Sequence, residues 1–174
     1  MKILTKQQLE KEIQRRNLKF KTASKAEKRV LLAKDVVKQI EIKKIVPEHG
    51  HFVDIGNIES FNEGDSIQAK LIDNSIPDCV CCALGALAIS CTLYKNKTKV
   101  KDYRNDFRYL GDAISEGIPL KNGLDKLFSK EQFKLIEMAF ELGEGYYRGY
   151  EDTPAVKFGK RFKSAQERLI GIME

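Results

Sequence analysis

The sequence has no apolar segment long enough to cross a membrane. Its longest uncharged run covers 16 residues, from 79 to 94, whereas a membrane-spanning helix needs about 20. Residues 1–21 are polar and charged, and they lack the apolar core of a secretory signal peptide. We therefore expect a soluble protein located in the cytoplasm, with no membrane partner.

The chain has few cysteines, and they are not spread along it. All four lie between positions 79 and 91, namely Cys79, Cys81, Cys82 and Cys91. A secreted disulfide framework would place its cysteines far apart, where they join distant loops. The clustering indicates reduced thiols, which most often pack as small buried hydrophobic side chains.

No internal repeat, low-complexity segment or complete set of catalytic residues is visible in the 174 residues. A chain of this length fits one domain and can bury roughly two thirds of its unfolded surface. We expect a single globular domain over residues 1–174, in which residues 1–20 can form a peripheral helical arm. The missing catalytic set favours a protein that is not an enzyme, although the sequence leaves this open.

Helix-start signals are frequent and indicate a mainly α fold. In a capping box, a hydroxyl and a Glu or Gln three residues later satisfy the first N–H groups of a helix. Four pairs match this pattern: Thr5 and Gln8, Ser24 and Glu27, Ser129 and Gln132, and Ser164 and Glu167. We predict helices near residues 5–18, 25–44, 79–94, 101–116, 122–128, 130–142 and 164–173.

The uncharged run from 79 to 94 predicts the buried centre of the domain. Asp78 can cap a helix that starts at Cys79. Gly85 costs about 1 kcal/mol of helix propensity relative to Ala, which a close approach of a neighbouring helix would explain. The predicted fold class is a single-domain helical bundle around a buried Cys-rich central helix.

A short β or extended element is expected near residues 50–58. The segment 51–55 alternates weakly between apolar and polar residues and is bounded by Gly50 and Gly56. Residues 67–71 can supply a partner strand or form a helical turn, and their pattern does not decide between the two.

Two histidines and two cysteines have the chemistry of a zinc site. His49, His51, Cys79 and Cys82 offer two imidazoles and two thiolates, which suit tetrahedral Zn²⁺. A thiol enzyme is the related alternative, because a helix N-terminus lowers the pKa of a thiolate and Cys82 would then resolve a mixed disulfide. We expect no cofactor, with packing as the main role of the thiols and zinc as the alternative.

Aromatic and basic residues gather in two C-terminal segments that can bind a ligand or partner. The cluster within 143–150 suits a protein interface or a stacking platform for bases, and residues 157–163 alternate aromatic and basic side chains. The alternative is that the rings pack on the core while the lysines are solvated. The candidate binding residues are Tyr146, Tyr147, Arg148, Tyr150, Lys157, Lys160 and Arg161.

Positive charge is concentrated in residues 1–50, which carry 14 Lys and Arg against 6 Asp and Glu. Such a region can attract an acidic partner by long-range steering, or it can be a solvated helical surface. No nucleic-acid-binding motif frames it.

Three segments together resemble a known family. Residues 26–37, 79–87 and 167–174 are similar, in order and spacing, to a family of small uncharacterised proteins of phages, prophages and bacteria. These proteins share a Cys-x-x-Cys-Ala-Leu-Gly-Ala-Leu core helix. The resemblance implies a mobile-element origin, and small accessory proteins of that kind often bind and inhibit a host factor.

The sequence is therefore compatible with three functions. The leading one is a non-enzymatic binding protein, a phage-encoded inhibitor of a host defence factor that acts in the host cytoplasm. The first alternative binds a nucleotide or nucleic acid, or sequesters a small nucleotide signal, with Arg148 and residues 157–163 around one pocket. The second alternative is a zinc- or thiol-dependent enzyme. The sequence leaves the partner and the oligomeric state open.

Overall fold

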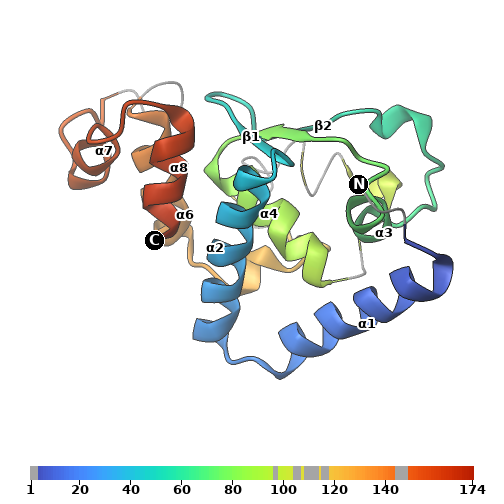
Figure 1. The fold of residues 1–174 in the computed structure, drawn as a ribbon. Helices are drawn as coiled ribbons and strands as arrows, with labels where there is room; N and C mark the ends of the chain where they lie inside the picture. Colours follow the sequence, from blue (N-terminus) through green and yellow to red (C-terminus); the bar gives the residue numbers. More distant parts are fainter. Residues whose placement is uncertain (1–3, 96–97, 104–106, 108–113, 115–117, 144–148) are drawn as a thin grey trace.

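The computed structural model describes residues 4–95, 98–103, 107, 114, 118–143 and 149–174. Within these residues the chain is mainly helical, with one small three-stranded sheet (Figure 1). This confirms the predicted fold class, which is mainly α with a short β element. Strand β2 (Val53–Ile55) lies inside the predicted interval 50–58.

The four predicted capping boxes are all formed. In each, the hydroxyl accepts a bond from the third helical N–H, and the Glu or Gln at that position accepts from the N–H of the capping residue. The helices that they start are α1 (Lys6–Thr22), α2 (Lys25–Glu41), α6 (Lys130–Glu141) and α8 (Ala165–Met173).

The sheet places β3 (Cys79–Cys81) between its two neighbours. Strand β1 (Ile45–Pro47) runs parallel to β3, with Ile45 opposite Cys79, and β2 runs antiparallel to it, with Val53 opposite Cys81. Both edges of the central strand are therefore paired with backbone partners, and its two cysteine side chains are buried.

The predicted helix 79–94 is wrong at its first residues. The helix α4 (Ala83–Tyr94) begins after the capping residue Cys82, and Asp78 does not cap it. An uncharged run is typical both of a buried helix and of a central strand. Here β1 and β2 supply backbone hydrogen-bond partners on both sides of β3, so the strand forms.

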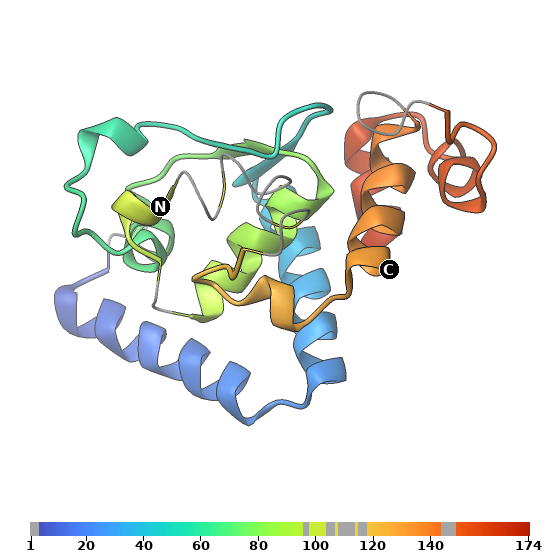
Figure 2. The ribbon, with the colours of Figure 1, turned by 180° about the vertical axis from the view of Figure 1, so that it is seen from behind.

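Every residue of α4 is buried, so this helix occupies the centre of the fold. Seen from opposite sides in Figures 1 and 2, it lies beside α2 and above α1. Its polar side chains are satisfied internally: Ser90 Oγ donates to Asp35 Oδ2 at 2.8 Å, and Thr92 Oγ1 donates to Ala88 O at 3.0 Å. The predicted buried Cys-rich centre is thus a strand followed by a helix.

Shorter elements complete the described chain. The segment that could have paired as a strand is a helix, α3 (Ile67–Ile72). The predicted helix 122–128 is a single 3-10 turn, and the predicted helix 101–116 falls mostly outside the described residues. The remaining elements are η1 (Ile58–Ser60), η2 (Val100–Asp102), η4 (Leu124–Lys126) and α7 (Pro154–Gly159).

The helices form two groups at opposite ends of the molecule. In both views α6, α7 and α8 lie together at one end, while α3 and η1 lie at the other, with α2 and α4 between them (Figures 1 and 2). Helix α1 packs against α4 and α3, and its buried Phe20 stacks on Tyr94 of α4 with the ring centroids 5.4 Å apart. Among the described residues, none of the helices combines the length and the apolar character that spanning a bilayer requires.

Gly85 is required by a close approach of the backbone before β2, rather than by a neighbouring helix. A Cβ atom at this position would overlap the carbonyl oxygen of Phe52 and would lie 2.7 Å from Cγ2 of Val53. The first turn of α4 can therefore lie against the chain before β2 only when residue 85 has no side chain.

We predict that Gly85→Ala lowers the free energy of unfolding by at least about 2 kcal/mol, because overpacking against backbone outweighs the gain of about 1 kcal/mol in helix propensity. Urea denaturation measures this change. The matched control is Gly64→Ala, since a Cβ there has no atom within 4 Å. Equal stability of the two variants would contradict the prediction.

Candidate functional site

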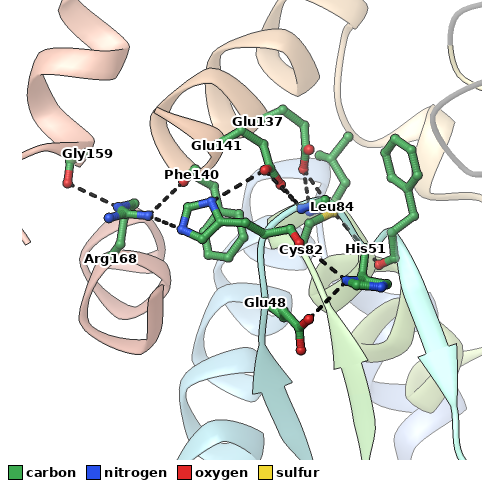
Figure 3. Close-up of polar contacts among 12 residues, drawn as sticks. Glu48, His51, Cys82, Leu84, Glu137, Phe140, Glu141, Gly159 and Arg168 are labelled. Carbon is green, nitrogen blue, oxygen red and sulfur yellow. Dashed lines mark hydrogen bonds and ion pairs between the residues drawn. The ribbon is translucent and has the colours of Figure 1, made fainter. Parts of the chain in front are cut away.

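The N-terminus of α4 is closed to water, and a carboxyl group from α6 takes the place of solvent there. Glu137 Oε1 accepts the backbone N–H of Leu84 at 2.9 Å and the thiol of Cys82 at 3.2 Å (Figure 3). The first N–H groups of a helix have no partner within the helix, so a buried start needs such an acceptor. Glu137 therefore holds α6 against α4.

Burial makes Glu137 an unusual carboxyl group. Its side chain is almost fully buried, and this burial raises its pKa from 4.5 to about 7. The Leu84 N–H and the Cys82 thiol favour the ionised form, while the nearby charge of Glu141 disfavours it. The loss of solvation outweighs the two hydrogen bonds, so Glu137 changes protonation near neutral pH.

Glu141 lies one helical turn further along α6 and binds the turn before β2. Its two carboxylate oxygens accept the N–H of Gly50, at 3.1 and 3.3 Å. Gly50 has a φ of +75°, in the left-handed region that favours glycine. His49 stacks on Phe140, with ring centroids 5.0 Å apart, and its Nδ1 lies 3.4 Å from Glu141 Oε2, a contact too poorly aligned to be a hydrogen bond.

Arg168 of α8 completes the network. It is buried, and its guanidinium donates to the carbonyl oxygens of Gly159, at 3.2 Å, and Phe140, at 3.0 Å. A third contact joins its Nη1 to Nε2 of His49. A buried guanidinium needs several acceptors, and these come from α6, α7 and the turn before β2.

The contact with Arg168 assigns the proton of His49. A guanidinium donates only and never accepts, so Nε2 must be the unprotonated nitrogen of a neutral ring. The proton then sits on Nδ1, the atom that faces Glu141. In this arrangement neither nitrogen of His49 has a lone pair left for a metal ion.

Three groups near this point have the chemistry of metal ligands. The Cys82 thiol and one oxygen each of Glu137 and Glu141 lie within 4.8 Å of one another. The Cys82 thiol already donates to Glu137, and Glu141 accepts from Gly50. The cluster is thus satisfied by hydrogen bonds, and His49 does not supply a fourth ligand.

Burial keeps the thiols of Cys79, Cys81 and Cys82 in the protonated form. All four cysteines are buried and free of disulfides. Burial raises the pKa of Cys79 to about 12 and raises the pKa values of Cys81 and Cys82 well above the ordinary thiol value. Although Cys82 caps a helix, the loss of solvation exceeds the favourable effect of the helix N-terminus.

The four residues of the zinc alternative do not converge on one centre. His49 and Cys82 belong to the network around α6. His51 turns away, with Nδ1 3.2 Å from Glu48 Oε1. Cys79 lines a different cavity, on the side of α1 and α2.

The C-terminal binding candidates are only partly described. Tyr146, Tyr147 and Arg148 lie outside the described residues. Tyr150 is exposed; its hydroxyl accepts a bond from Lys134 Nζ at 3.1 Å, and this ammonium also lies 4.2 Å from the ring centroid.

The basic residues after Pro154 contact residues close to them in the sequence. Lys157 lies 4.0 Å from Asp152, Lys160 Nζ is 3.5 Å from the carbonyl of Glu151, and Arg161 lies over the ring of Phe158 at 5.5 Å. Phe158 in turn makes an edge contact with Phe162 at 5.4 Å. These contacts do not by themselves form a pocket around the three basic residues.

A cavity of about 480 Å³ opens between α1 and α2, with α3 and β3 at its base. Its volume is in the range of small-molecule sites. It combines an aliphatic lining with five cationic side chains and one carboxylate. The charged residues are Lys11, Glu12, Arg15, Arg16, Lys38 and Lys44.

A second groove of about 570 Å³ lies between α2, α6 and α8 and is mostly apolar. Val30, Ala33 and Val37 line it from α2, and Ile172 and Met173 line it from the end of the chain. Val30 is 52% exposed, which is high for an aliphatic side chain on a packed helix.

Sequence reasoning missed Glu137, Glu141 and Arg168. One signal was present: apolar residues cover more than half the circumference of 130–142, so a carboxyl group there can be forced into contact with the core. It missed the cavity as well, although Arg15 and Arg16 belong to the basic first third of the chain. No local pattern indicates that Lys38 faces them.

Comparison of the chain with protein-family models, with curated proteins and with solved structures gives no match.

We predict that Glu137 makes the protein less stable as the pH rises. Its pKa in the folded state is about 7, above the ordinary 4.5, so its contribution is complete below pH 4.5 and is lost as the pH rises through 7. The free energy of unfolding should fall by up to roughly 3 kcal/mol over this window. Glu137→Gln cannot ionise but keeps an acceptor for Leu84, so its stability should fall less between pH 4.5 and 8.

Urea denaturation at several pH values measures the difference between the two proteins. Asp35, whose pKa burial also raises, contributes a slope of the same sign to both proteins and cancels in the comparison. The control is Glu10→Gln on the exposed side of α1. Parallel curves for the parent protein and Glu137→Gln would show that the carboxyl group does not titrate in the fold.

We predict that the folded protein resists alkylation. Iodoacetamide reacts with thiolates, and burial both shields the four sulfur atoms and raises the pKa of Cys79, Cys81 and Cys82. At pH 8, mass spectrometry should find almost no modification in the time that labels all four thiols in urea. Rapid labelling of Cys82 without urea would show a reactive thiol and would favour a thiol enzyme.

Proposed function

We propose that the protein is a non-enzymatic binding protein and that its ligand occupies the cavity between α1 and α2. The observation that carries this proposal is the composition of the cavity. It joins an aliphatic base to five cationic side chains against one carboxylate, which suits a ligand with an apolar body and a negative charge. A phage-encoded inhibitor of a host factor would act by binding a molecule of the host in this cavity.

The burial of the chemistry-bearing residues supports the same proposal. Cys82 and Glu137 are buried and hydrogen-bonded to each other, and His49 is held between Arg168 and Glu141. A nucleophile has to be exposed to substrate and activated by a base. These residues instead join α4, α6 and α8.

A second candidate function is recognition of a protein partner through the groove between α2, α6 and α8. The exposure of Val30 and the apolar lining favour it, because an amphipathic partner helix can place its apolar face in such a groove. Arg29 and Lys34 line the same groove with one acidic residue, Glu174. A partner helix with acidic residues beside its apolar face would fit this excess of positive charge.

We predict that the protein binds anilinonaphthalene sulfonate, an anionic probe with an apolar body, at one site in the cavity. Lys38→Glu should weaken binding about tenfold, because it replaces an attractive charge by a repulsive one at the entrance. Fluorescence titration at low salt measures the affinity, and cooperative urea unfolding of each variant excludes binding to a loosened core.

Lys34→Glu is the matched variant, since it makes the same charge change on the same helix but lines the second groove. Its affinity should equal that of the parent protein. A loss confined to Lys34→Glu would place the probe in the second groove, and equal affinity of all three proteins would refute a site at the cavity.

A further inference from the structure

The base of the cavity is made of aliphatic side chains from two helices and one strand. α3 contributes Leu71 and Ile72, α4 contributes Ile89 and Leu93, and β1 contributes Ile45. Among the described residues, none of those that line the cavity is aromatic. A nucleotide base is bound mainly by stacking on aromatic rings, so this lining favours an alkyl chain.

The cations at the cavity are not equivalent. Glu12 pairs with Arg15 and Arg16, in each case at 2.7 Å. Lys44 Nζ donates to the carbonyl of Ile76 at 3.0 Å. Two further cations line the cavity, one on α1 and one on α2.

Those two cations are Lys11 on α1 and Lys38 on α2. Neither side chain forms a hydrogen bond or ion pair with any residue that the structure describes. An ammonium group has three donors and suits a carboxylate, sulfate or phosphate. The two lysines therefore provide a charged entrance above the aliphatic base.

We infer that the cavity binds a single-chain amphiphile: an alkyl chain that lies against Leu71 and Ile72, with an anionic head group between Lys11 and Lys38. This inference rests on the proposed function and names its ligand class. Ile42, which lines the cavity and is 54% exposed, becomes covered by the chain near the head group.

The test uses the protein of 174 residues and four ligands below their micelle-forming concentrations. Isothermal titration calorimetry at pH 8 compares dodecanoate, dodecyl phosphate, hexanoate and dodecyltrimethylammonium, with adenosine monophosphate as the nucleotide arm. At least one of the two anionic dodecyl compounds should bind with a stoichiometry of about one. It should bind at least about tenfold more tightly than hexanoate, because of its longer buried chain, and than the cationic analogue.

Two exposed aliphatic residues provide matched variants. Ile42→Ser should weaken binding of the anionic dodecyl compound at least about threefold, because apolar contact is lost. Val30→Ser, which changes a side chain of similar exposure in the second groove, should leave it unchanged. An equal loss of affinity in both variants would show that the alkyl chain does not lie at Ile42.

The outcomes separate this inference from the proposed function. If anilinonaphthalene sulfonate binds at the cavity and only adenosine monophosphate displaces it, the ligand is a nucleotide and the inference is wrong, while the proposed function stands. Equal affinity for dodecanoate and its cationic analogue would also overturn the anionic head group. If neither the probe nor any of the five ligands binds, both proposals fail.

Discussion

A helix that is buried along its whole length needs hydrogen-bond acceptors from the protein for its first N–H groups. For α4, Glu137 provides such an acceptor. Water cannot satisfy the N–H of Leu84, so a carboxyl oxygen 2.9 Å away does. That carboxyl group must leave water in order to do so, and burial raises its pKa to about 7. This contact joins α6 to the start of α4.

The same constraint extends outward from α4 as a chain of donors and acceptors. Glu141 binds Gly50, and Arg168 joins His49 to the carbonyl of Phe140. A buried guanidinium without these acceptors would cost several kcal/mol. The residue types that suggest catalysis or metal binding in the sequence, His49 and Cys82, are thus used to hold α8 and the sheet against α6. Residue type alone does not distinguish a reactive group from a buried donor or acceptor.

Features formed by residues close together in the sequence could be predicted, whereas features that depend on contacts between distant residues could not. Each capping box involves four consecutive residues, so all four were predicted correctly, together with the starts of their helices. The strand Cys79–Cys81 depends on pairing with β1 and β2, both distant in sequence, and an uncharged run is compatible with a strand or a helix. The contacts of Glu137 and the placement of Lys38 opposite α1 likewise depend on how helices pack, which no local pattern encodes.

The cavity between α1 and α2 is part of the core rather than an addition to its surface. Arg16 at its edge lies 3.7 Å from the buried Asp35, and Asp35 accepts a hydrogen bond from Ser90 in the middle of α4. Ile89, the residue before Ser90, lines the base of the cavity. A ligand there would contact the central helix directly, and the charged edge is fixed to that helix through Asp35. The helix that organises the fold therefore also shapes the cavity.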